Sequence, residues 1–207
     1  MLTLAALFAA VLAAASWISL PLPFTPIPAN LGTLAVALAG ALLGCRYGTF
    51  SVLVYILLGA AGVPVFAGFT GGFGHIAGPT GGYIIGYLTS AFICGAIVDL
   101  LYASQAHLPD MRACSSSSMK ADCCESQDDL RKKSWKTYAV TTAAALLGTV
   151  SCYALGTIWF IILTGSSLAA SLAMCVIPFI PGGVFKIIAA AILIPALRPV
   201  LEKMKAR

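Results

Sequence analysis

Long apolar runs that are almost free of charge dominate this chain of 207 residues. Overall 60% of the residues are hydrophobic and 9% are charged, whereas roughly a quarter are charged in soluble domains. The composition and the runs predict an all-α membrane protein with a single membrane domain over residues 1–207. The expected six transmembrane helices cover about residues 2–20, 31–44, 49–63, 83–102, 137–163 and 182–199.

The run at 2–20 has no Lys or Arg before its apolar core, so we interpret it as a retained span rather than a signal peptide. The runs 31–44 and 49–63 are short, and by length alone either could be re-entrant. Between them, residues 45–48 are expected to form the turn of a hairpin.

Basic residues are distributed very unevenly along the chain. Residues 45–48, a hydrophilic loop at 104–136 and the C-terminal tail hold eleven of the twelve Lys and Arg residues. Cytoplasmic segments of membrane proteins are enriched in these residues. The pattern predicts that both termini are cytoplasmic and agrees with six spans, including the hairpin. The polar 104–136 loop is expected to be loosely ordered.

Three irregular segments then fall on the outer side: residues 21–30, 64–82 and 164–178. The first has four prolines in eight residues and is either a cap over a site or a stiff connector. The second carries seven glycines, and non-helical backbone at membrane depth lines a cavity or is buried in protein. Lys186 lies about four residues into the last span from the same side. The sequence predicts a ligand pocket near the outer face, although Lys186 could also extend to the interface.

The sequence argues against catalysis, because no carboxylate lies on the outer side to act with Lys186 and no hydrolase or nucleotide-binding motif occurs. The His and Cys spacings fit no standard zinc site, so neither a metal nor a cofactor is expected. Nothing points to nucleic acid. The remaining classes are a membrane protein that binds or translocates a small anionic ligand, and a structural membrane protein.

Several motifs, taken in their order along the chain, resemble the BioY family. They are Pro23-Phe24-Thr25-Pro26-Ile27-Pro28, Leu38-Ala39-Gly40-Ala41-Leu42-Leu43-Gly44, Tyr55-Ile56-Leu57-Leu58-Gly59, Gly62-Val63-Pro64-Val65-Phe66-Ala67, Gly78-Pro79-Thr80-Gly81-Gly82-Tyr83 and Phe179-Ile180-Pro181-Gly182.

The resemblance implies a biotin-binding S component of an energy-coupling factor transporter in the cell (plasma) membrane. Its partners would be biotin, membrane lipid, a transmembrane coupling subunit and two cytoplasmic ATPases. A same-fold S component for another small anionic vitamin-like ligand is the alternative. By itself, the small-residue face of the first span favours packing within the protein. The resemblance instead suggests a docking face for the coupling subunit, made of Ala5, Ala6, Ala9, Ala10, Ala13 and Ala14.

The resemblance also implies a set of substrate-binding residues, with Lys186 facing the valerate carboxylate or the polar ring of biotin. The set comprises Lys186, Tyr83, Thr80, Asn30, Thr33, Thr25, Phe66, Gly71, Gly72, Tyr55 and Gly183.

Two departures from the family pattern concern the polar ring. Gly183 stands where the family usually has Asp, and Gly32 stands where many members have Gln. Burying the two ureido N–H groups of biotin without partners would cost about 1–3 kcal/mol each. Their acceptors are therefore expected from Asn30, Thr33, a tyrosine or backbone carbonyl groups.

Overall fold

The computed structural model of the chain describes residues 2–20, 28–106 and 125–205. Its elements follow in the order α1 (Leu2–Trp17), β1 (Ser19–Leu20), β2 (Ala29–Asn30), α2 (Gly32–Ala60), α3 (Phe73–Ala77), α4 (Gly81–Ala106), α5 (Glu125–Thr164), α6 (Leu168–Cys175), a 3-10 turn η2 (Ile177–Phe179) and α7 (Ile180–Lys205).

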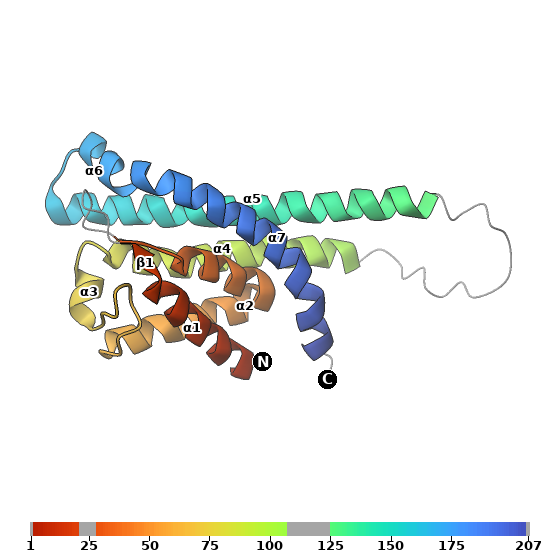
Figure 1. Ribbon diagram of the computed structural model, residues 1–207, viewed down its shortest axis with the longest axis horizontal. Coiled ribbons are helices and arrows are strands. Elements are labelled where there is room, and N and C mark those ends of the chain that lie inside the picture. Colours follow the sequence, from red (N-terminus) through yellow and green to blue (C-terminus); the bar gives the residue numbers. More distant parts are fainter. Residues whose placement is uncertain (1, 21–27, 107–124, 206–207) are drawn as a thin grey trace, which may run out of the picture.

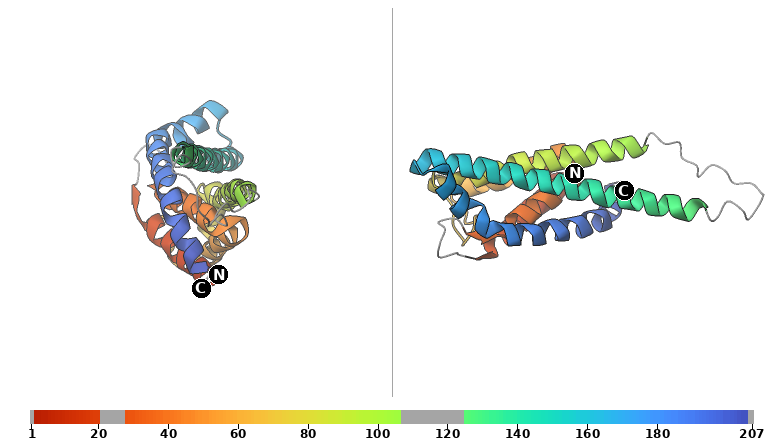
Figure 2. Two further views of the ribbon diagram at one scale, coloured as in Figure 1. Left: turned by 90° about the vertical axis from the view of Figure 1, so that its right-hand side faces the viewer. Right: turned by 90° about the horizontal axis from the view of Figure 1, so that it is seen from above.

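Long helices lie side by side and form an elongated bundle (Figure 1). Helix α4 packs between α2 and α5, α1 packs on α2, and α7 crosses α5 and α2. The two turned views agree on this arrangement (Figure 2). Within the described residues, four segments have the length and hydropathy of membrane spans, and α1 is a shorter apolar helix: the four are Gly32–Ala60, which reverses within its length, Gly81–Leu100, Ala139–Thr164 and Leu168–Ile194.

Helix α2 reverses direction at Gly44, whose φ of 86° and ψ of 175° are not helical. After the break the chain returns along its own first arm, because a Cβ placed on Gly48 would lie 2.7 Å from the backbone oxygen of Ala39. The hairpin expected between residues 44 and 49 is therefore present, but the expected four-residue turn is wrong. A single glycine in a left-handed conformation makes the reversal, so residues 45–48 already belong to the second arm.

Asp99 of α4 stabilises this reversal. Its Oδ2 accepts a hydrogen bond from the backbone N–H of Cys45 at 2.7 Å, at the start of the returning arm. A helix start has backbone N–H groups without helical partners, and a carboxylate there satisfies one of them and interacts favourably with the helix dipole.

We expect Asp99→Ala to lower the free energy of unfolding by about 1–3 kcal/mol, since the Cys45 N–H would lose its acceptor. Asp99→Asn keeps an oxygen at this position and should retain most of the stability. Thermal unfolding of both variants in detergent measures the difference. Equal melting temperatures for Asp99→Ala and the unsubstituted protein would show that the cap contributes nothing.

Four segments contain more helix than the sequence-based expectation gives them. The 104–136 segment was expected to be loosely ordered, yet α4 continues to residue 106 and α5 begins at Glu125. The acidic residues of 125–129 precede the basic residues of 131–133 in sequence, which is the order that favours a helix. The 164–178 link contains α6, whose first turn is capped by the Ser167 side chain accepting from the N–H of Ala170.

The remaining two differences are small. The 64–82 segment is not wholly irregular, because α3 forms one short helix within it, and α7 continues beyond Pro199 to Lys205. The all-α expectation is also incomplete, since β1 and β2 pair antiparallel with Ser19 opposite Asn30.

The alanine rows of α1 face in different directions. Ala5, Ala9 and Ala13 are buried, and they belong to clusters that include residues of α2. Ala6, Ala10 and Ala14 are exposed. The first row therefore packs within the chain, as the residues alone favour, and only the second row is open to another protein.

Candidate functional site

A cavity of about 340 Å³ lies at the end of the bundle that carries α3, α6 and the β1–β2 pair (Figure 1). Its volume falls within the range of roughly 300–1,000 Å³ that is typical of small-molecule sites. Its lining comes from β2, both arms of α2, residues 66–80, α4, α5, η2 and α7: Pro28, Asn30, Thr33, Tyr55, Phe66, Ala67, Thr70, Gly74, His75, Gly78, Pro79, Thr80, Tyr83, Ile84, Tyr87, Tyr153, Phe179 and Lys186.

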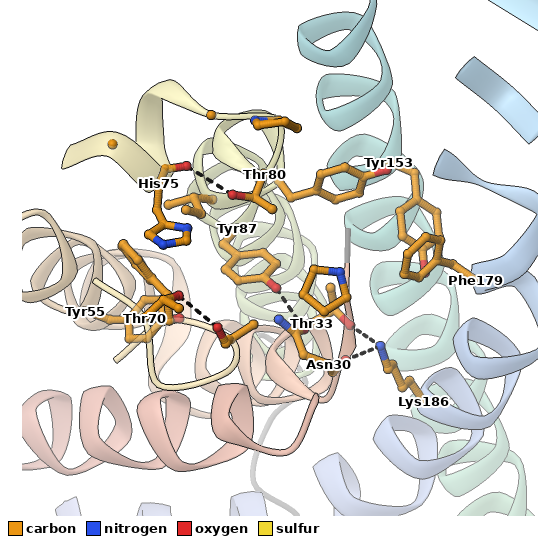
Figure 3. Close-up of a pocket in the computed structure, with 18 residues that line it drawn as sticks. Asn30, Thr33, Tyr55, Thr70, His75, Thr80, Tyr87, Tyr153, Phe179 and Lys186 are labelled. Carbon is orange, nitrogen blue, oxygen red and sulfur yellow. Dashed lines mark hydrogen bonds between the residues drawn. The ribbon is translucent and has the colours of Figure 1, made fainter. Parts of the chain in front are cut away.

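Lys186 supplies the positive charge of the cavity. Its Nζ donates to the backbone oxygen of Asn30, and also to the Thr33 Oγ1 at 3.0 Å (Figure 3). Both acceptors are neutral, and the lining residues include no Asp or Glu. An ammonium group that is partly removed from water and lacks a counter-charge favours the binding of an anion.

Asn30 is held in one orientation by two hydrogen bonds. Its Oδ1 accepts from the backbone N–H of Gly32 at 3.2 Å and from the Tyr87 hydroxyl at 3.0 Å. A backbone N–H can only donate, so the side-chain oxygen of Asn30 must face it. The amide NH₂ group of Asn30 is thereby left as a donor.

Aromatic side chains form two walls of the cavity. On one wall the rings of Tyr83, Tyr153 and Phe179 lie 6.3–6.5 Å apart in every pairing. On the other, the ring of Phe66 lies 5.7 Å from that of Tyr55 and 6.5 Å from that of His75. Such walls suit an apolar ligand body, whose burial is favourable by roughly 25 cal/mol for each Å² of apolar surface.

The Phe66 wall depends on a tight backbone. Gly59 lies directly under Phe66, since a Cβ there would meet the end of its ring at 2.1 Å. Trp17 at the end of α1 adds an outer support: its indole N–H donates to the Pro64 oxygen at 2.8 Å, and its ring stacks on Phe69 with a centroid separation of 4.9 Å. These contacts fix the 64–70 segment against α1 and α2.

Of the eleven substrate-binding residues expected from sequence, seven line this cavity, three do not, and Thr25 lies outside the described residues. The cavity gathers Lys186, Tyr83, Thr80, Asn30, Thr33, Phe66 and Tyr55.

Three glycines of the expected set lie elsewhere. Gly71 and Gly72 support the loop, because Gly71 packs on the Val63 backbone and the N–H of Gly72 donates to the Gly59 oxygen at 2.7 Å. Gly183 does not line the cavity, although an added Cβ there would lie 3.5 Å from the hydroxyl of Tyr153, which does. Thr25 lies outside the described residues.

Sequence reasoning missed several lining residues. Tyr87 follows Tyr83 by four positions, so both lie on one face of α4 and the helical spacing could have identified it. Tyr153 and Phe179 gave no such signal, because only the packing of α5, η2 and α7 brings them together. His75 belongs to the 64–82 segment, which is expected to be irregular, and it lies in α3 on the cavity wall. Among the described residues no group of His, Cys, Asp or Glu could hold a metal ion.

Comparison with known proteins gives consistent results. Over 95 residues the chain is 44% identical to "Biotin transporter BioY" of Thermotoga maritima, covering 46% of this chain and 55% of that protein. It is 48% identical over 93 residues to "Probable biotin transporter BioY" of Pyrococcus horikoshii, covering 45% of this chain and 56% of that protein. The matched part thus spans about half the length of these curated relatives.

A solved structure is similar over nearly the whole chain. It is described as the S-component for biotin from an ECF-type ABC transporter, with a TM-score of 0.73 and 26% identity over 96% of this chain and 90% of that one. The profile of the BioY family matches residues 1–203. Because this match covers almost every residue, the chain belongs to the BioY family.

Proposed function

We propose that this protein is the substrate-binding membrane subunit of a biotin uptake system. The observation that carries the proposal is Lys186, whose partners among the described residues are neutral, in a cavity walled by aromatic side chains. Biotin offers a carboxylate for the cation and an apolar body for the walls. Family membership and the names of the relatives support biotin over other small anions.

The chain is a multi-pass membrane protein, and we propose six crossings with both termini in the cytoplasm. The six rods would be α1, the two arms of α2, α4, α5 and α7. The basic segments support this orientation: Arg46 lies near the α2 reversal, and α5 begins at the end of the bundle remote from the cavity (Figure 1). The positive-inside rule then places the cavity near the outer face.

We further propose that the protein acts with a transmembrane coupling subunit and two cytoplasmic ATPases. The similar solved structure is an S-component from an ECF-type ABC transporter, which supports partners of this kind. The exposed row Ala6, Ala10 and Ala14 is smooth enough for close approach of another membrane helix, whereas Ala5, Ala9 and Ala13 are covered by this chain.

A thermal-shift series in detergent tests the ligand assignment. Biotin and desthiobiotin should raise the melting temperature, because a ligand that binds only the folded state stabilises it. Lipoate and thiamine should not. A shift with lipoate or thiamine but not with biotin would favour another vitamin-like ligand on the same fold, and no shift with any compound would favour a structural membrane protein.

Gly183→Asp tests the departure from the family pattern. We expect the affinity for biotin to stay within about threefold of the unsubstituted protein, since Gly183 does not line the cavity and the nearest group to the new side chain is the Tyr153 hydroxyl. Isothermal titration with biotin measures this. A gain of tenfold or more would show that the ring of biotin lacks an acceptor in the unsubstituted protein.

A further inference from the structure

Five of the seven hydroxyl groups that line the cavity donate their protons to other groups of the protein. Thr70 Oγ1 donates to the Ala67 oxygen at 2.8 Å, and Thr80 Oγ1 donates to the His75 oxygen at 3.0 Å (Figure 3). A carbonyl oxygen can only accept, so the direction of both bonds is fixed. Toward a ligand, these two hydroxyl oxygens can therefore act only as acceptors.

Three tyrosines of the lining behave in the same way. The Tyr83 hydroxyl donates to the Cys175 oxygen at 2.9 Å, and the Tyr55 hydroxyl donates to the buried Ser16 Oγ at 2.9 Å. The Tyr87 hydroxyl donates to Asn30 Oδ1, which the Gly32 N–H fixes as an acceptor. Asn30, which sequence reasoning considered as an acceptor for the ureido group, is therefore a donor through its NH₂ group.

The Lys186 and Asn30 donors lie on a different side of the cavity from the Thr70 and Thr80 hydroxyls, whereas the Tyr87 hydroxyl lies beside Asn30. Figure 3 shows Lys186 with Asn30 and Thr33 on one side, and Tyr55, Thr70, His75 and Thr80 on the other. The first side presents N–H donors and a positive charge. The second presents hydroxyl oxygens whose protons are committed elsewhere.

We infer that the cavity selects a ligand with an anionic acceptor at one end and N–H donors at the other, and that Thr70 and Thr80 are specificity-determining residues for those donors. The inference rests on the proposed function, and it gives biotin an orientation. The carboxylate lies at Lys186 and the Asn30 NH₂ group, and the cyclic urea lies at the 66–80 segment. A ligand lacking N–H groups leaves these oxygens without partners, which disfavours it.

In this orientation the glycine at position 183 leaves the urea with acceptors. The acceptors for the urea come from residues 66–80 on the side of the cavity away from α7, so a carboxylate on α7 is not required. The two urea N–H groups and the two threonine hydroxyls are also matched in number.

Thr70→Val and Thr80→Val test the inference, because valine keeps the shape of threonine and removes the oxygen. The probes are biotin, biotinamide and the two biotin analogues that are methylated at one ureido nitrogen. We expect each variant to bind biotin and biotinamide about tenfold more weakly, by the same factor for both. Each N-methyl analogue should bind the unsubstituted protein more weakly than biotin does. When the threonine that faces the methylated nitrogen is replaced by valine, the affinity for that analogue should fall little further.

Two controls separate this effect from packing. Thr70→Ser keeps the hydroxyl and should bind biotin within about threefold of the unsubstituted protein. Thr89→Val removes a hydroxyl that donates to the Gly86 oxygen at 3.0 Å on α4, outside the cavity lining, and should leave affinity unchanged.

Each outcome decides between the claims. If, in every combination, the fold-loss of affinity from the threonine substitution multiplies the fold-loss from the N-methyl group, the two groups do not interact and the orientation is wrong. An equal loss of affinity in Thr70→Ser and Thr70→Val would also overturn it. Failure of the unsubstituted protein to bind any of the four probes would instead contradict the proposed function. Melting temperatures without ligand identify any variant that is not folded, and the other threonine then decides.

Discussion

Replacement of Lys186 by methionine should weaken biotin binding by about 100-fold or more. Methionine keeps most of the aliphatic length of lysine but removes the charge. The carboxylate of bound biotin would then face only the Asn30 NH₂ group and the Thr33 hydroxyl. Removing one member of a charge pair that is shielded from water costs roughly 3–5 kcal/mol, which corresponds to more than two orders of magnitude in affinity.

Biotinamide gives this prediction its specificity. Because the amide carries no charge, its affinity should fall much less than that of biotin when Lys186 is replaced, so the preference for the acid should disappear. Arg46→Met is the matched control: it removes one positive charge from an exposed position at the α2 reversal, outside the cavity lining. Titration calorimetry on the three proteins gives the affinities. Binding of biotin to Lys186→Met within threefold of the unsubstituted protein would show that the lysine does not hold the carboxylate.

The second large effect concerns the packing of α2 on α4 rather than the site. A Cβ on Gly40 would lie 2.6 Å from the backbone oxygen of Ala91 and 3.2 Å from its Cα. Both atoms belong to the backbone of α4, so neither can move aside without shifting the helix. We expect Gly40→Ala to lower the free energy of unfolding by roughly 1–3 kcal/mol.

Gly182→Ala is the control for this prediction. It adds the same methyl group near the start of α7, where no atom lies within 4 Å of the new Cβ. Alanine is also the better helix former, so this variant should melt at or slightly above the temperature of the unsubstituted protein. Thermal unfolding in detergent compares the two. A Gly40→Ala protein as stable as Gly182→Ala would mean that α2 and α4 are farther apart than described.

The fold was predictable where hydropathy and charge decide it. The hairpin between the two short apolar runs followed from Arg46, and the break at Gly44 lies at the predicted end of the first run. The helix α6 was missed because its segment carries no charge and was interpreted as a link, although Ser167 before an apolar run is a typical helix start. The early start of α5 was missed because a polar segment was taken to be loosely ordered.

The site was predictable only in part, for a physical reason. Lys186 can be identified from sequence because a charge within an apolar run is energetically costly unless it faces a cavity or a partner. The contacts of its neighbours depend on how helices turn about their axes when they pack. Thus Ala5 is buried while its neighbour Ala6 is exposed. In the same way, Tyr153 lines the cavity while Gly183 does not. Which acceptor each hydroxyl group donates to likewise depends on the three-dimensional packing.

The most direct test is saturation binding of radiolabelled biotin to the purified protein in detergent. The account predicts saturable binding of one biotin per chain, with competition by desthiobiotin. The affinity for biotin should be lower by about 100-fold or more in Lys186→Met. Arg46→Met should bind like the unsubstituted protein. Absence of saturable binding in a protein that unfolds cooperatively on heating would contradict the assignment of this cavity to biotin.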